Sequence, residues 1–220
     1  MPTRLDDASP MDEKTFDFQS SAVLEQRQKD MIIYRPNLRY GLTPDVQIES
    51  QGSIYSGNGE GGSGETDLSV QYRFLKSENI PQFSLTPMIA FPSGKGMDHA
   101  ELSWQLNSTY TLSGTTDEPK SEVHVNFTSR TNRNRSEGER GSLENFAFGS
   151  SHKITNYVAM ILDVAIEEQS EKNQSLQVAE LGFHLDLGRK NYIGLSYSQG
   201  FGNSCTSSAA LLGYEKEFGI

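Results

Sequence analysis

The chain has 220 residues, enough for one domain or a single large barrel. Its formal net charge of -10 argues against nucleic-acid binding, which requires a basic surface, and against simple adhesion to anionic lipid headgroups. The mean hydropathy of -0.57 excludes membrane-spanning helices, and the single cysteine, Cys205, can form neither an intramolecular disulfide nor a thiolate metal site.

Apolar and polar residues alternate with a period of two along most of the chain, which is typical of half-buried antiparallel strands. Residues 1–14 are polar and are expected to be disordered or to lie at the mouth of a barrel, while residues 15–220 form the barrel itself. The strands expected in chain order cover residues 15–28, 31–42, 45–55, 66–76, 82–92, 100–113, 121–130, 142–153, 155–168, 175–188, 190–199 and 206–219.

The connections between these strands alternate in length. Those after even-numbered strands are short, whereas those after most odd-numbered strands are longer and polar. The long ones are expected at 57–65, 93–99, 131–141, 168–174 and 200–207. Short periplasmic turns, longer extracellular loops and an even strand number are features of bacterial outer-membrane barrels. The sequence therefore predicts an all-β protein, a single antiparallel transmembrane β-barrel of about 12 strands.

The main alternative is a soluble β-barrel or sandwich with its apolar face inward. A barrel of ~8 strands is about the size that side chains can fill, so twelve strands with inward apolar faces would leave a void. The C-terminal strand, with apolar residues at alternate positions up to Phe218 and Ile220, resembles the signal read by outer-membrane insertion machinery. Residues 1–14 lack the basic and apolar regions of a signal peptide, so an exported protein is expected to have had its signal removed.

Residues 31–95 contain the segments LRYGLTPDVQIE, TDLSVQYRFL and SLTPMIAFPSG. Together they resemble the bacterial family called MetA-pathway of phenol degradation proteins. The resemblance implies an outer-membrane barrel that admits aromatic or other hydrophobic compounds, and it supplies no catalytic residues.

Strand parity divides the side chains between the two faces of the barrel. Aromatic rings are expected outward, near the membrane interfaces, at Tyr34, Tyr40, Tyr72, Phe74, Phe91, Trp104, Tyr110, Tyr214 and Phe218. The charged residues and histidines expected to line the lumen are Arg35, Arg39, Arg73, Arg130, Asp17, Glu49, Asp67, Glu122, His124, Asp163, Glu180, His184, Asp186, Glu215 and Glu217. Since acids outnumber arginines, the lumen should be mildly selective for cations.

Three motifs suggest other chemistry. Gly57 to Gly62 match the dinucleotide pattern G-x-G-x-x-G, but the following residues read as a strand where a helix is needed, which favours a flexible loop. Ser151 and His152 suggest a hydrolase in the barrel wall, although adjacent strand residues point to opposite faces. No pair of histidines has metal-ligand spacing.

Two loop clusters have both a functional and a simpler interpretation. Carboxylates and an amide could bind calcium at a loop base, but acidic loops are more often simply solvated. The residues are Asn58, Glu60, Glu65 and Asp67. The basic cluster either binds lipopolysaccharide phosphates or is a simple solvated loop. Its residues are Arg130, Arg133, Arg135 and Arg140. No cofactor or metal is expected.

The sequence thus predicts a non-enzymatic outer-membrane channel for passive uptake of small molecules, aromatic or hydrophobic ones included. A structural or adhesive barrel with a closed lumen, an outer-membrane hydrolase and a soluble barrel that binds a ligand remain alternatives. The expected partners are outer-membrane lipid, lipopolysaccharide and a small solute, and no nucleic acid.

Overall fold

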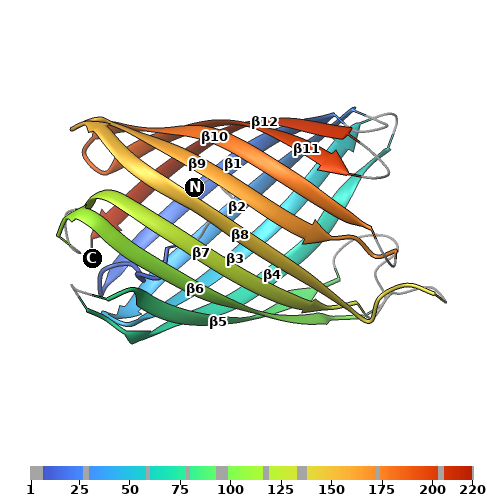
Figure 1. Ribbon diagram of the computed structural model, residues 1–220, viewed down its shortest axis with the longest axis horizontal. Helices are drawn as coiled ribbons and strands as arrows, with labels where there is room; N and C mark the ends of the chain where they lie inside the picture. Colours follow the sequence, from blue (N-terminus) through green and yellow to red (C-terminus); the bar gives the residue numbers. More distant parts are fainter. Residues whose placement is uncertain are drawn as a thin grey trace.

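The protein, described by a computed structural model, is a barrel of twelve antiparallel strands (Figure 1). The structure describes residues 7–26, 30–57, 60–77, 80–92, 99–115, 119–132, 138–171, 174–202 and 206–219. The strands are β1 (Thr15–Gln26), β2 (Asp30–Thr43), β3 (Val46–Gly57), β4 (Glu60–Leu75), β5 (Gln82–Phe91), β6 (Glu101–Gly114), β7 (Pro119–Thr131), β8 (Ser142–Thr155), β9 (Val158–Glu168), β10 (Ser175–Gly188), β11 (Asn191–Gly202) and β12 (Thr206–Gly219). No helix in this described part of the chain is long and apolar enough to cross a membrane.

Each strand pairs with its neighbours in sequence, and β1 pairs with β12 to close the sheet. The closing register aligns Phe16 with Phe218 and Gln26 with Ser208, so β1 pairs with β12 over its full length. A closed sheet leaves no edge strand whose backbone groups lack partners. The predicted strand number and barrel architecture are therefore confirmed.

The two ends of the barrel differ. The turn end carries the connections that follow β2, β4, β6, β8 and β10, and the last of these is only Arg189 and Lys190. The loop end carries the connections that follow the odd-numbered strands, and the longest of them joins β7 to β8 through residues 132–141. β1 begins and β12 ends at the turn end, where Thr15 pairs with Gly219.

Two of the predicted long loops are corrected by the structure. The glycine-rich stretch 57–65 belongs mostly to β4, and β11 continues to Gly202 where a loop was expected from residue 200. In the β3–β4 hairpin, Tyr55 lies opposite Gly62, and a Cβ on that glycine would meet the Tyr55 hydroxyl oxygen at 3.1 Å. Strand pairing uses only backbone groups, and an aromatic ring on the neighbouring strand can shield a glycine from solvent. The loop prediction was wrong because it was based on glycine content alone.

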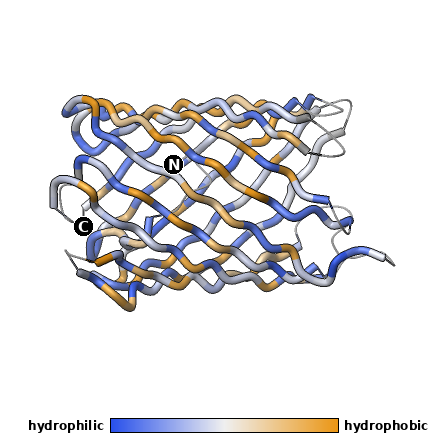
Figure 2. Tube along the Cα trace, in the orientation of Figure 1, coloured by the Kyte–Doolittle hydropathy of each residue, from blue (hydrophilic) through white to orange (hydrophobic). Residues whose placement is uncertain are grey.

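The large apolar side chains are mostly exposed on the outer face, and the polar ones are mostly buried inside. Hydrophobic and hydrophilic positions alternate along the strands (Figure 2). On β9, Leu162 is 45% exposed while the adjacent Asp163 is 4% exposed. Of the nine aromatic residues expected outward, eight are at least 38% exposed and Tyr40 is half-buried. This orientation excludes the soluble barrel with an apolar interior and is the arrangement of a transmembrane barrel.

A charge on the outward face of β9 should destabilise the barrel much more than loss of a charge on the inward face. Leu162→Arg should lower the free energy of unfolding by about 2–4 kcal/mol, because it places a guanidinium near the centre of the apolar band. Asp163→Asn, of nearly the same shape and facing inward, should cost much less. Urea titration of the refolded barrel, followed by its heat-dependent gel migration, would measure both. Equal losses at the two positions would contradict this orientation of β9.

Candidate functional site

A segment that precedes β1 occupies part of the lumen at the turn end. Ala8 is fully buried there, and its amide donates a hydrogen bond to Thr109 Oγ1 at 3.0 Å. Polar side chains of β3 to β6 form hydrogen bonds with the backbone and hydroxyl groups of this segment, which has no strand partner among the described residues. The other bonds are Gln71 Nε2 to Asp7 O (2.7 Å), Ser9 Oγ to Gln82 Oε1 (3.1 Å) and Met11 N to Gln47 Oε1 (2.9 Å).

Gly41 on β2 makes the close approach of this segment possible. A Cβ at Gly41 would lie 2.0 Å from the carbonyl oxygen of Asp12, which no side chain could tolerate without a shift. The amide of Lys14 also donates to the carbonyl of Gly41 at 2.8 Å. The segment 7–14 is therefore packed against the β2–β6 wall, and the open part of the lumen lies toward the remaining strands.

Two cavities lie in the lumen among the described residues. The loop-side cavity has a volume of about 660 Å³, and the turn-side cavity has a volume of about 670 Å³. Segment 7–14 contributes Asp7, Ser9, Pro10, Met11 and Asp12 to the turn-side cavity only. Six residues line both cavities, so the cavities meet at a region that we call the waist. Its residues are Arg39, Glu49, Thr86, His184, Tyr192 and Glu215.

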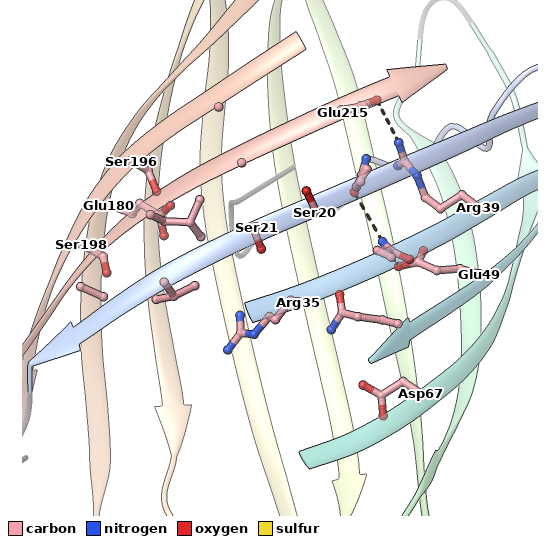
Figure 3. A pocket seen from close by; sticks show the side chains of 18 of the residues that line it. Ser20, Ser21, Arg35, Arg39, Glu49, Asp67, Glu180, Ser196, Ser198 and Glu215 are labelled. Carbon is pink, nitrogen blue, oxygen red and sulfur yellow. Dashed lines mark hydrogen bonds and ion pairs between the residues drawn. The ribbon is translucent and has the colours of Figure 1, made fainter. Parts of the chain in front are cut away.

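One side of the waist is a cluster of ionisable groups on β12, β1, β2 and β3. The guanidinium of Arg39 donates through Nε to the fully buried Asp17 at 2.9 Å, and through Nη2 to Asp17 as well. Nη2 also donates to Glu215 at 3.1 Å (Figure 3). Glu49 is the cross-strand partner of Arg39 on β3 and accepts a hydrogen bond from Asn37 Nδ2 at 2.7 Å. Three carboxylates thus surround one guanidinium.

Beside this cluster the waist has an aromatic side, which begins at Tyr192 on β11, the cross-strand partner of Glu215. The rings of His184 on β10 and Tyr192 on β11 lie 4.9 Å apart between centroids, at an interplanar angle of 31°. Gly194, the cross-strand partner of His184, has no side chain to fill the lumen beside them. The waist therefore joins a charged surface to an aromatic one.

Most of the residues predicted to line the lumen reach one or both cavities. Arg35, Asp67, Arg130 and Glu180 line the loop-side cavity, and Glu122, His124 and Asp186 line the turn-side cavity. Arg39, Glu49, His184 and Glu215 belong to both, as described.

Four predicted residues face inward without lining either cavity. Arg73 is buried and binds the β2–β3 turn, donating to Asp45 Oδ1 at 2.8 Å and to the carbonyl of Pro44 at 2.7 Å. Glu217 forms an ion pair with Lys190 at the turn end. The buried Asp163 lies opposite Glu180 across β9 and β10, and Asp17 supports Arg39.

The sequence prediction of the lumen considered only charged residues and histidines. It therefore did not include the less polar wall that lies opposite segment 7–14. On β8 to β12 many inward positions carry glycine, alanine or serine, which keep this side of the lumen open. Apolar residues also contribute to this wall. Uncharged residues at inward positions of the strands are the sequence pattern that could have predicted it. The cavity-lining members at inward positions are Ala159, Ile161, Gly194, Ser196, Ser198, Ala209, Leu211 and Gly213, and Tyr157 and Val158 also line the turn-side cavity where β9 begins.

The serine and histidine that were considered for a hydrolase do not contact each other. His124 Nε2 lies 3.3 Å from Ser151 Oγ, and Ser121 Oγ lies 2.5 Å from His152 Nδ1, both across β7 and β8. Nδ1 of His124 contacts the hydroxyl of Thr109 at 3.1 Å, at the position where a catalytic triad requires an orienting carboxylate. These contacts join neighbouring strands of the barrel wall.

The other sequence motifs are also accounted for where the structure describes them. The G-x-G-x-x-G stretch belongs to the β3–β4 hairpin, with no helix after it. Arg130 pairs with Glu65 and Glu101 inside the barrel, and Arg140 pairs with Glu168 at 2.8 Å. Asn58, Arg133 and Arg135 lie outside the described residues, as does the side chain of Glu60. Within the described residues, no group of three or more acidic, histidine or cysteine side chains could hold a metal ion.

The closed sheet, its apolar outer face and its polar lumen define a transmembrane β-barrel of the outer-membrane type. No family model matches the chain, and no curated protein matches it either. The predicted resemblance of residues 31–95 to the phenol-degradation family thus stays a prediction, although the fold that it implied is the fold observed.

Solved structures share this fold at low sequence identity. The COG4313 outer membrane channel from Pseudomonas putida F1 superposes with a TM-score of 0.77 at 10% identity, covering 98% of this chain and 100% of that one. The NanC porin has a TM-score of 0.68 at 7% identity, with coverage of 90% and 98%. The CymD monoaromatic hydrocarbon channel has a TM-score of 0.56 at 8% identity, with coverage of 96% and 90%. Such identities establish the fold alone.

Removal of residues 1–12 should enlarge the turn-side cavity while leaving all twelve strands in place. Single-channel conductance should rise by roughly twofold or more, because the narrowest polar section of a pore limits its current. Gly41→Val should act in the same direction by displacing Asp12. Gly219→Ala is the matched control, since a Cβ there meets nothing within 4 Å. Conductance unchanged by both the deletion and Gly41→Val would contradict the position of the segment.

Proposed function

We propose that the protein is a narrow channel of the bacterial outer membrane for passive uptake of small molecules. The observation that carries this proposal is the pair of cavities that meet at the waist inside a barrel with an apolar exterior. Twelve strands enclose more space than inward side chains fill, and polar groups line what remains. By this proposal the turn end faces the periplasm and the loop end faces the outside of the cell.

The charges of the lumen support a preference for cations. The loop-side cavity is lined by six carboxylates and three arginines, and the turn-side cavity by six carboxylates and three basic side chains. Low-dielectric walls focus such a field on whatever enters the pore, and rings of acidic side chains favour cations. Acidic sugars and phosphorylated solutes should therefore pass poorly.

The less polar wall of β8 to β12 supports uptake of solutes with an apolar part. Tyr157, Val158 and Ile161 border the turn-side cavity together with Pro10 and Met11 of segment 7–14. Among the structural neighbours, CymD is described as a monoaromatic hydrocarbon channel and TodX as a toluene transporter. We infer that neutral or weakly cationic molecules with an aromatic or aliphatic body are the substrates.

A second candidate, a structural or adhesive barrel with a closed lumen, is favoured by segment 7–14. Buried Ala8 and the bonds to β3–β6 place protein atoms where solute would otherwise pass. The two candidates differ in one measurable property, since only a channel conducts ions. Insertion of the wild-type protein into planar bilayers without any current step would establish the closed barrel and overturn the channel.

The charge of the waist should set the ion selectivity. Under a salt gradient, the wild-type channel should pass K⁺ over Cl⁻ by a factor of about three, as expected for a pore ringed by carboxylates. Glu49→Gln should bring this ratio closer to one, whereas Glu144→Gln, exposed on the outer face of β8, should leave it unchanged. Reversal potentials measure the ratio directly. A clear preference for Cl⁻ in the wild type would refute the charge assignment.

A further inference from the structure

Among the described residues, the charged side of the waist holds more carboxylates than guanidinium groups. Arg39 is the single guanidinium among Asp17, Glu49 and Glu215, and its two ion-paired partners already use its Nε and Nη2 groups. With all groups ionised, the formal charge of this cluster is minus two. An incoming cation therefore meets a site whose internal cation is already engaged.

The aromatic side of the waist offers a second kind of attraction for the same ligand. Tyr192 and His184 line both cavities, so any solute that crosses the waist passes their rings. The face of a tyrosine ring attracts an organic ammonium group, and a pair of tilted rings can also stack with an aromatic solute. Gly194 and Ser196 on β11 leave space beside Tyr192 for such a ring.

The two sides select for a ligand that combines both properties. An anion of the same size is repelled by the carboxylates, and a neutral ring gains only the stacking contact. A bare inorganic cation is attracted by the charge but leaves the aromatic side unused. Beyond the waist, Val158 and Ile161 provide apolar contacts on the same wall for the body of the solute.

We propose that the waist is a binding site for small aromatic cations, such as aryl ammonium compounds, and that it retains them during passage. The ammonium group lies against Glu49 and Glu215, and the ring lies against Tyr192 and His184. This inference extends the proposed channel function. Passage of the cation depends on that function, but binding does not require an open pore.

Block of the K⁺ current by benzyltrimethylammonium tests the site. The compound should reduce the wild-type current reversibly, while benzoate and benzyl alcohol at the same concentration should not. Tyr192→Leu should raise the half-blocking concentration roughly fivefold, within the range expected for a cation–π contact. Tyr192→Phe keeps the ring and should retain block. Tyr197→Leu, on the outer face of the same strand, is the control and should behave as the wild type.

Calorimetric titration of benzyltrimethylammonium into the detergent-solubilised barrel gives a readout that is independent of conduction. Saturable binding to the wild type that Tyr192→Leu weakens and Tyr192→Phe preserves would support the site even in a barrel that passes no current. Equal block and binding in Tyr192→Leu and Tyr197→Leu, or equal block by benzoate, would overturn the inference while leaving the channel intact. Absence of wild-type current alone would instead overturn the proposed function.

Discussion

The structure depends on one constraint, which is that backbone N–H and C=O groups in the hydrocarbon core of a membrane have no water to bind. The pairing of β1 with β12 meets this constraint by turning a twelve-stranded sheet into a closed ladder. Once the ladder is closed, the two-residue period assigns every side chain to lipid or to lumen. The apolar band of Leu162 and its neighbours and the polar interior of Asp163 are thus two consequences of the same closure.

Closure also creates a problem in the interior, since a barrel of this size is too wide for its own inward side chains to fill. Segment 7–14 fills part of the turn end, and its backbone groups would be costly to bury without partners. Gln47, Gln71, Gln82 and Thr109 supply those partners, and Gly41 supplies the space. The cavities are what this packing leaves. The loop-side cavity is lined by all twelve strands, whereas the turn-side cavity also borders segment 7–14.

The charges of the lumen divide into structural and accessible ones. Arg73 and Glu217 hold turns, through Asp45 and Lys190, and they anchor the turn end of the barrel. Arg39, Glu49 and Glu215 line both cavities and remain available to a solute. Arg73 is buried, so loss of its carboxylate partner would leave an uncompensated charge. The Lys190–Glu217 pair is exposed and should tolerate substitution better.

The sequence alone determined the strand number, the antiparallel order and the face on which each side chain lies. These features follow from the local alternation of apolar and polar residues and from the turn residues, both of which can be read directly from the sequence. The same reasoning failed at 57–65, where glycine and serine read as a loop although Tyr55 and Gly62 pair across a hairpin, because cross-strand shielding is not a local property.

Only the tertiary structure decided which inward residues meet. Asp17, Arg39, Glu49 and Glu215 come from four strands, and two of these strands are neighbours only because the barrel closes. The facing of His184 and Tyr192 depends on the β10–β11 register, and the burial of Ala8 depends on side chains as far along the chain as Thr109. Strand parity determines which face of the barrel a residue occupies. Strand register and barrel closure determine its position along the barrel axis and its neighbours, and a binding site depends on both.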